Sequence, residues 1–227
     1  MNHNVYFISG IDTDAGKTYA TGYLAALYNS QGIRCITQKF IQTGNVGRSE
    51  DIEVHRQLMR TGLLPEDHEE LTMPEIFSYP ASPLLAARID GRPIRFDRIR
   101  RATRELAARY DRVLIEGAGG LMVPLTEDLL TIDYIRREGY PVIFVTSGRL
   151  GSVSHTLLSL EAMERRGIQL AMLAYNHYPA DTDPVLQDDT RRYLQTYLKS
   201  HFPNAEWTEI PLLSGADSCA ENGAQGQ

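Results

Sequence analysis

Cysteine and lysine are both scarce in this chain of 227 residues. The two cysteines, Cys35 and Cys219, have no metal-ligand spacing, so neither a disulfide framework nor a zinc site is expected, and a reducing cytoplasm fits. Lysine supplies only three of the 23 basic residues, Lys17, Lys39 and Lys199. In a chain that otherwise favours arginine, a lysine indicates a site that needs a compact ammonium group rather than a planar guanidinium.

Long hydrophobic runs and an excess of positive charge are also absent. No apolar stretch approaches the length of a membrane span, and the first residues lack the charged and apolar regions of a signal peptide. The net charge of -6 argues against a sequence-independent grip on nucleic acid or on an acidic membrane, because both need clustered cations. We therefore expect a soluble cytoplasmic protein that binds neither nucleic acid nor membrane.

Strand and helix patterns alternate along the chain. Apolar runs predict five strands, at residues 5–9, 34–38, 112–115, 141–146 and 170–175. Helical spacing of apolar residues appears between strands, at residues 20–28, 99–106 and 152–166. The alternation predicts an α/β fold with a mostly parallel central sheet and helices on both faces. Ligands of such sheets bind beyond the carboxyl ends of the strands.

The expected domain organisation is simple. A chain of this length and 42% hydrophobic content buries about 70% of its unfolded surface, and we predict one domain over residues 1–213. The segment 62–93 carries five prolines and is predicted to be an irregular excursion over the sheet edge. Residues 214–227 are small and polar without an apolar period, which predicts a disordered tail.

The strongest motif is G-I-D-T-D-A-G-K-T, from Gly10 to Thr18, between a predicted strand and a predicted helix. That context identifies a phosphate-binding loop of the P-loop type, one residue longer than the common form. Its backbone N–H groups and the helix N-terminus bind phosphate oxygens, while Gly16 allows close backbone approach. Lys17 is expected to reach the β- and γ-phosphates and Thr18 to ligate Mg²⁺, so the motif predicts a P-loop NTPase fold that binds a magnesium nucleotide.

Two further loops follow predicted strands. Lys39 begins K-F-I-Q-T-G, which places an ammonium group at the sheet edge near the expected γ-phosphate, where it could stabilise charge in phosphoryl transfer. Asp51 lies early in a helix within S-E-D. Glu116 begins E-G-A-G-G after the third strand, a position where a carboxylate binds nucleotide-bound Mg²⁺ and the glycines leave room for substrate.

Together these residues resemble the dethiobiotin synthase family of P-loop enzymes. The resemblance covers residues 5–213 and includes the phosphate loop, K-F-I-Q-T-G, S-E-D and E-G-A-G-G. It also includes P-A-S-P followed by D-G-R-P-I, and P-V-I-F-V-T with its R-L-G-S-V-S-H continuation. It implies an ATP- and Mg²⁺-dependent cyclo-ligase of biotin biosynthesis that carboxylates 7,8-diaminononanoate with CO₂ and closes the ureido ring through a carbamate and a carbamic-phosphoric anhydride. It also implies a homodimer with the substrate at the subunit interface.

The resemblance assigns roles by matching position. The implied catalytic residues are Thr13, Lys17 and Lys39, and the implied Mg²⁺ ligands are Thr18, Asp51 and Glu116. The implied substrate contacts are Thr13, Lys39, Thr43, Gly119, Ser152, Val153 and Ser154, the last three from the partner subunit. The implied nucleotide contacts are Asp14, Ala15, Gly16, Lys17, Thr18, Tyr19, Asp51, Glu116, Gly117, Ala118, Gly119, Asn176, His177, Pro211, Leu212 and Leu213.

Five positions depart from the family pattern, and they leave alternatives open. Phe40 replaces a usual proline, Thr43 a usual serine, Leu84 a common histidine, Ser154 a frequent asparagine and His177 a common aspartate. A related P-loop ligase on a different amine would keep the same phosphate site. A ParA/MinD-like ATPase switch is the other alternative, but it would have an extra lysine early in the loop and a basic face or amphipathic tail. A corrin-amidating relative would need a glutaminase domain, for which this chain has no room.

Overall fold

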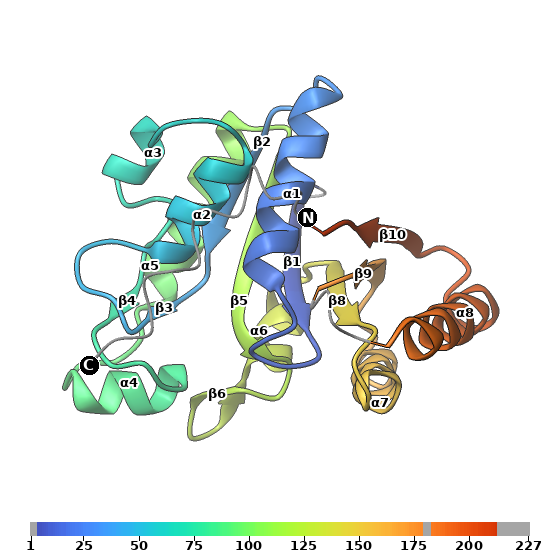
Figure 1. Ribbon diagram of the computed structural model, residues 1–227. Coiled ribbons are helices and arrows are strands. Elements are labelled where there is room, and N and C mark those ends of the chain that lie inside the picture. The colour runs from blue at the N-terminus through green and yellow to red at the C-terminus, as the bar shows by residue number, and fades with distance from the viewer. Residues whose placement is uncertain (1–3, 179–182, 213–227) are drawn as a thin grey trace.

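A computed structural model describes residues 4–178 and 183–212, and its centre is a parallel six-stranded sheet (Figure 1). The strand order is β10-β9-β8-β1-β5-β2, and every pair in this sheet is parallel. The strands are β1 (Val5–Gly10), β2 (Cys35–Lys39), β5 (Arg112–Gly120), β8 (Val142–Ser147), β9 (Leu170–Asn176) and β10 (Glu206–Ile210). Because the strands are parallel, their carboxyl ends meet at one edge of the sheet.

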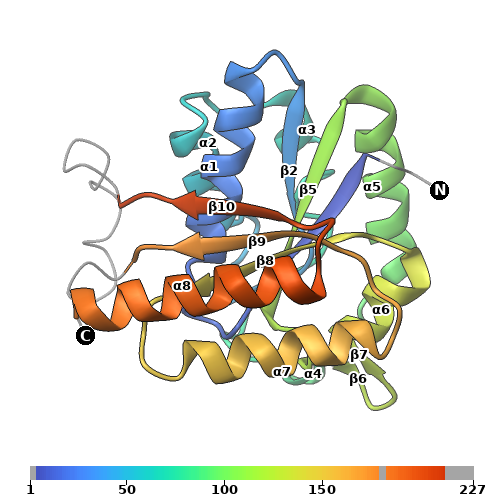
Figure 2. The same cartoon turned by 90° about the vertical axis from the view of Figure 1, so that its right-hand side faces the viewer.

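Eight helices accompany the sheet within the described residues. They are α1 (Lys17–Ser30), α2 (Glu50–Leu58), α3 (Pro65–His68), α4 (Pro83–Ile89), α5 (Phe96–Arg109), α6 (Thr131–Glu138), α7 (Ser152–Glu164) and α8 (Pro184–His201). Helix α1 covers one face of the sheet and packs against α2, whereas apolar residues of α5, α6, α7 and α8 belong to the core on the other face. Figure 2 shows α7 and α8 lying side by side below β8 to β10.

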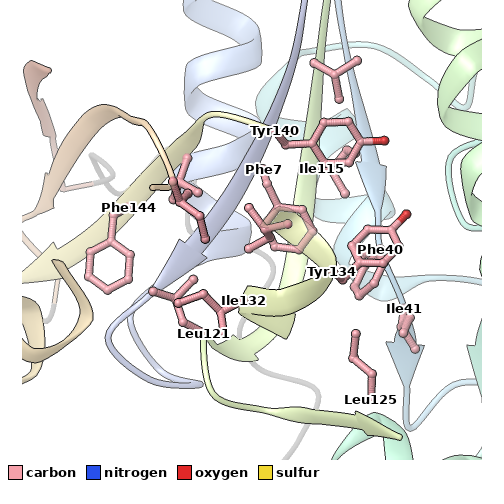
Figure 3. Close-up of a cluster of buried hydrophobic side chains, with 14 of the residues drawn as sticks. Phe7, Phe40, Ile41, Ile115, Leu121, Leu125, Ile132, Tyr134, Tyr140 and Phe144 are labelled. Atoms are coloured by element: carbon pink, nitrogen blue, oxygen red, sulfur yellow. The ribbon is translucent and has the colours of Figure 1, made fainter. Parts of the chain in front are cut away.

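The strand sequences explain this two-faced packing, because successive strand side chains point to opposite faces. In β1, Phe7 belongs to the core under α5 to α8, and the next residue, Ile8, belongs to the core under α1. Both side chains are fully buried, as expected for a sheet covered on both sides. Figure 3 shows the larger core, in which Phe40 packs against Phe7 and Tyr134 with ring centroids 5.4 and 4.7 Å apart.

The predicted fold class is confirmed, including the five predicted strands and the P-loop context. The sixth strand, β10, was missed because its sequence, E-W-T-E-I, is half polar, as suits a strand at the edge of the sheet. The segment 62–93 is also more regular than expected, since it contains α3, α4 and strand β4 (Ile76–Phe77). Pro65 and Pro83 stand in the first turns of their helices, where a missing N–H costs nothing.

Two small sheets complete the described part of the chain. Strand β3 (Gln42–Thr43) pairs in parallel with β4, and β6 (Pro124–Thr126) pairs antiparallel with β7 (Leu129–Leu130). The predicted tail, residues 214–227, lies outside the described residues, and the single-domain organisation stays a prediction. Among the described helices, none is long and apolar enough to cross a membrane.

Candidate active site

The phosphate loop joins the end of β1 to the start of α1 (Figure 1). Gly16 precedes the helix with φ 75°, in the left-handed region that favours glycine. A Cβ there would also collide with Nδ2 of Asn176, at the end of β9, so a side chain at this position would have to displace Asn176. At the start of the loop, a Cβ on Gly10 would lie 2.9 Å from the Cβ of Ala15. Both glycines are therefore required for this compact loop.

Lys17, the first residue of α1, folds back over the loop. Its Nζ donates to the carbonyl oxygens of Asp12 at 2.7 Å and Thr13 at 3.3 Å, and the side chain is 4% exposed. Burial lowers the pKa of Lys17 to about 8, against the attraction of Glu116. The ammonium group contacts only neutral oxygens within the loop, which leaves its charge available to an anion bound there.

A cluster of charged side chains lies where the end of β2 pairs with the middle of β5, because β5 continues past Glu116 to Gly120 and does not end before Glu116 as predicted. Lys39 and Glu116 are opposite each other in the parallel pairing of these strands, and Lys39 Nζ lies 2.7 Å from Glu116 Oε1. Asp51 completes an ion pair with the same Nζ. Its helix, α2, begins after Ser49, whose Oγ accepts the N–H of Ile52 at 3.2 Å and caps the helix.

Thr18 of α1 joins this cluster and connects it to the phosphate loop. Its hydroxyl lies 2.8 Å from Glu116 Oε1 and 3.2 Å from Asp51 Oδ1. The structure thus brings together the loop threonine, both carboxylates and the second rare lysine, which come from four different elements.

Burial and charge act in opposite directions on this cluster. Burial alone would lower the pKa of Lys39, but Glu116 and Asp51 together raise it above its usual value. Burial alone would raise the pKa of Glu116, yet Lys39 and His55 hold it far below its ordinary range. Lys39 is therefore a fixed cation and Glu116 a fixed anion at neutral pH.

The donor set of the cluster fits Mg²⁺. Magnesium prefers hard oxygen ligands and usually combines one or two carboxylates with water and substrate phosphates. The Thr18 hydroxyl and the Asp51 and Glu116 carboxylates are such donors, and they already lie within hydrogen-bond distance of one another. No group of three or more His, Cys, Asp or Glu side chains suited to a metal occurs in the described part of the chain. A metal here would accordingly depend on the hydroxyl and on a nucleotide.

The residues expected to bind the nucleotide base gather at the ends of β9 and β10. Asn176 is fully buried and donates from Nδ2 to the carbonyl of Ala15 at 3.1 Å. His177 pairs with Glu209 at 2.8 Å, which helps to lower the pKa of that carboxyl although burial alone would raise it. Pro211 and Leu212 follow β10 and are exposed, whereas Leu213 lies outside the described residues.

The other expected nucleotide contacts belong to the loops already described. Asp14 is exposed in the phosphate loop, and Tyr19 is half-buried in the first turn of α1, with its ring 6.3 Å from that of Tyr23. Gly117 and Ala118 continue β5 beyond Glu116, and the carbonyl of Gly117 lies 3.4 Å from Lys39 Nζ.

The residues expected to contact the substrate are more scattered. Thr13 and Gly119 are neighbours, since a Cβ on Gly119 would lie 3.9 Å from Thr13 Oγ1. Thr43 lies on β3 and has no side-chain hydrogen bond to the charged cluster. Ser152, Val153 and Ser154 form the first turn of α7. Within the described chain, no hydrogen bond or ion pair joins this turn to Lys39 or to Glu116.

An apolar groove of about 550 Å³ lies between the loop after β5 and the outer face of α7. Leu121, Val123 and Pro124 line one side, and Leu158 and Ala162 line the other. Leu158 is 61% exposed, and helix α7 has apolar residues on its outer face as well as on its buried face. Such an exposed apolar surface beside a polar site is typical of a place where a ligand or a second protein binds.

The sequence prediction missed several polar residues around the site. His55, one turn after Asp51 on α2, lies 2.7 Å from Glu116 Oε2. Arg149, after β8, pairs with Asp12 of the phosphate loop at 2.5 Å. The spacing of His55 four residues after Asp51 was the available signal, because residues at that separation share a helix face.

One departure from the family pattern has a structural explanation. Phe40 is fully buried, and its N–H donates to the carbonyl of Glu116 at 2.8 Å. A proline at this position has no N–H and could not make this bond. Phe40 therefore extends the pairing of β2 with β5, and its side chain fills the core.

The fold and the loop geometry define a P-loop nucleotide-binding protein. The AAA domain family matches residues 4–213. The ATP-dependent dethiobiotin synthetase BioD 2 of Pasteurella multocida is 46% identical over 92% of this chain and 98% of its own length. The ATP-dependent dethiobiotin synthetase BioD of Chlorobaculum tepidum is 49% identical over 88% of this chain and 84% of its own length. The chain belongs to the dethiobiotin synthetase family and is accordingly an enzyme of the ligase class.

Solved structures agree on the fold alone. A ParA family ATPase from Chlorobium tepidum matches with a TM-score of 0.52 and 13% identity, over 96% of this chain and 88% of that one. Chloroplast FtsY from Physcomitrella patens matches with a TM-score of 0.50 and 17% identity, over 89% of this chain and 56% of that one. At these identities the likeness carries no information about reaction or partner.

Proposed function

We propose that the protein catalyses the ATP- and Mg²⁺-dependent carboxylation and ring closure of 7,8-diaminononanoate in the cytoplasm, a step of biotin biosynthesis that forms dethiobiotin, the product in the names of its relatives. The observation that carries the proposal is the position of Lys39. Lys39 is buried and lies between the carboxylates of Asp51 and Glu116, and Thr18 of the phosphate loop belongs to the same cluster. This arrangement occurs in a chain that belongs to the dethiobiotin synthetase family.

The reaction needs an amine that attacks CO₂ and loses a proton to form a carbamate. A carbamate oxygen then attacks the γ-phosphorus of ATP, the bond to ADP breaks, and a carbamic-phosphoric anhydride forms. The second amine attacks the carbamate carbon, loses a proton and expels phosphate, which closes the ureido ring. Each step redistributes negative charge near the γ-phosphate, where a fixed cation is most useful.

Lys39 suits the chemical step because its charge is permanent and its position is fixed. Two carboxylates hold the ammonium group, so little reorganisation is needed when charge develops on the transferring phosphoryl group. We assign Lys39 to the carbamate oxygen and the phosphoryl group, with Thr13, Thr43 and Gly119 as further substrate contacts.

The phosphate loop binds ATP through its backbone N–H groups and Lys17, whose ammonium group contacts only loop carbonyls. Thr18, Asp51 and Glu116 would hold Mg²⁺ through one hydroxyl and two carboxylate oxygens. When bound, Mg²⁺ supplies neutralisation of the charge on the β- and γ-phosphates. Asn176, His177, Pro211 and Leu212 are assigned to the base, from the ends of β9 and β10.

We further propose that the protein is a homodimer and that the apolar groove beside α7 lies at its interface. The groove offers apolar walls to the hydrocarbon chain of the diamine, and the exposed Leu158 and Met122 offer contact area to a second subunit. The first turn of α7, with Ser152 to Ser154, would then contact the substrate bound by the partner.

The test of the reaction is ATP turnover with and without 7,8-diaminononanoate and bicarbonate, with the product identified by mass. We expect ADP formation to depend on both the diamine and bicarbonate and to yield one dethiobiotin per ADP. Diamine-independent turnover would support the ATPase-switch alternative. Turnover stimulated by another amine would support a ligase with a different substrate, for which the departures Leu84, Ser154 and His177 leave room.

The test of the dimer is complementation. A Ser152→Trp chain and a Lys39→Ala chain, each inactive alone, should recover up to about a quarter of wild-type activity when refolded together, because random pairing gives hybrid dimers with one intact site. Sedimentation should show a dimer. A fully active monomer would rule out a shared site.

A further inference from the structure

A chain of hydrogen bonds runs from Glu116 into the interior behind the proposed metal site. His55 Nε2 lies 2.7 Å from Glu116 Oε2, and His55 Nδ1 lies 3.1 Å from the Thr37 hydroxyl. Arg56 Nη1 donates to the same hydroxyl at 2.9 Å. His55 and Thr37 are fully buried and Arg56 is 2% exposed. Every member of this chain is therefore out of contact with bulk solvent.

The donors and acceptors of this chain fix one arrangement of protons. Arg56 can only donate, so the Thr37 oxygen accepts the N–H of Arg56. The Thr37 hydroxyl can then donate its O–H to His55 Nδ1. The remaining ring nitrogen, Nε2, then carries a proton and donates it to Glu116 Oε2. This tautomer satisfies all four groups, as buried polar groups require.

Both ends of the chain are anchored. Arg56 makes two parallel bonds to Asp67, at 2.8 and 2.7 Å, and Asp67 also accepts from the Thr72 hydroxyl at 2.7 Å. At the other end, His55 is fixed by the packing of α2 against α1. A Cβ on Gly22 of α1 would lie 3.1 Å from the Cα of His55, which shows that the two helices pack closely at this point. His55 consequently has little freedom to rotate or withdraw.

These fixed hydrogen bonds give the two carboxylate oxygens of Glu116 different partners. Its Oε2 is occupied by His55, while Oε1 faces Thr18 and Lys39. A carboxylate held by one oxygen in this way keeps the other oxygen directed at the phosphate loop. In metal sites, partners that orient a ligand in this manner typically contribute 10- to 100-fold in metal affinity or activity.

We propose that His55 is a positioning residue that orients Glu116 toward the magnesium nucleotide, held in its working tautomer by Thr37 and Arg56. The inference rests on the metal ligands assigned under the proposed function. It makes His55, and not only the ligands themselves, a determinant of how well Mg²⁺ binds with the nucleotide.

The test separates metal binding from nucleotide binding and from turnover. The Kd of ADP is measured by calorimetry in EDTA and again at saturating Mg²⁺, and the ratio gives the contribution of the metal. In His55→Leu we expect the Kd in EDTA to stay within about twofold of wild type, while the tightening by Mg²⁺ falls about tenfold or more. In His55→Gln, whose amide can still donate to Glu116, most of the tightening of ADP binding by Mg²⁺ should be kept.

Thr103→Val is the matched control. Its buried hydroxyl donates to Gln38 Oε1 at 2.7 Å, on the strand that carries Thr37, and makes no hydrogen bond to Glu116. We expect a similar loss of stability and an unchanged response to Mg²⁺. If His55→Leu does not fold, Thr37→Val tests the same chain, with an expected loss of about threefold in the magnesium effect and none in Thr37→Ser.

The outcomes distinguish the inference from the proposal beneath it. A wild-type protein whose affinity for ADP ignores Mg²⁺ would overturn the metal assignment and the inference with it. A wild-type response that persists in full in His55→Leu or in Thr37→Val would overturn the inference alone.

Discussion

The phosphate loop and the paired strands β2 and β5 each have one buried lysine beside them, yet the two regions affect its charge in opposite ways. Lys17 is 4% exposed and Lys39 is 5% exposed, so burial does not distinguish them. Lys17 contacts carbonyl oxygens of the loop, and its pKa falls to about 8 because of burial. Lys39 contacts two carboxylates, which raise its pKa in spite of burial. The partners, and not the depth, set the behaviour of each ammonium group.

This difference suggests a division of labour. A cation without anionic contacts is suited to bind the charge of an incoming nucleotide. A cation already neutralised by Asp51 and Glu116 gains less from binding alone, and its fixed position is useful when charge moves during reaction.

The largest expected effect comes from removing the charge of Lys39. Lys39→Ala should lower the rate of the chemical step about a hundredfold or more, about 3 kcal/mol, because the stabilisation appears chiefly in the transition state. Lys39→Arg should not rescue it, since the planar guanidinium directs its donors differently. The measurement is single-turnover conversion of labelled bicarbonate at saturating ATP and diamine. A near-normal rate in Lys39→Ala would refute the assignment.

A change at Lys17 should reduce nucleotide affinity as well as rate. In Lys17→Met we expect the Kd of ADP to rise about tenfold or more, whereas Lys39→Ala should change it by less than about threefold. Calorimetric titration of both variants checks this contrast. Equal losses of affinity would erase the proposed division between the two lysines.

The proposed metal ligands should show an intermediate effect that magnesium can reverse. If Asp51 and Glu116 hold Mg²⁺ as proposed, Asp51→Asn and Glu116→Gln each remove an anionic oxygen ligand, and the Mg²⁺ concentration for half-maximal turnover should rise about tenfold. High Mg²⁺ should restore part of the activity. Wild-type turnover of both variants at low Mg²⁺ would show that the cluster does not hold the metal.

The smallest effect on turnover is expected at Asp67, on the far side of the buried network. Burial alone would raise its pKa, but Arg56 and the bonds from Leu64 and Thr72 hold it below the ordinary value. Because the folded pKa is depressed, its contribution to stability is present above the unfolded pKa and is lost as pH falls through the folded value.

Asp67→Asn should therefore lower the free energy of unfolding at pH 7 by about 3 kcal/mol, with turnover within about threefold of wild type. The difference from wild type should shrink below about pH 4, where the carboxylate of the unfolded chain is already protonated. Urea unfolding at several pH values measures it. A difference that stays constant down to pH 2 would contradict the assignment of this charge to folding.

Much of the fold and part of the site could be predicted from local sequence. The phosphate loop is one continuous segment of sequence, so the spacing of Gly10, Gly16, Lys17 and Thr18 is enough to predict its conformation. Lys39 and Glu116 could be placed together because parallel strands end at one edge. Strand β10 was not predicted, because an edge strand with one solvated side lacks a continuous apolar run.

The sequence by itself determined five of the six strands of the central sheet, the phosphate loop, and the presence of one lysine and two carboxylates near it. Only the tertiary structure decided that Thr37, His55, Arg56 and Asp67 form one buried chain behind Glu116, because their hydrogen bonds join residues from separate elements. It also decided the opposite pKa shifts of Lys17 and Lys39. Both shifts depend on burial and on neighbouring charges, which exist only once β2, β5, α1 and α2 have packed together.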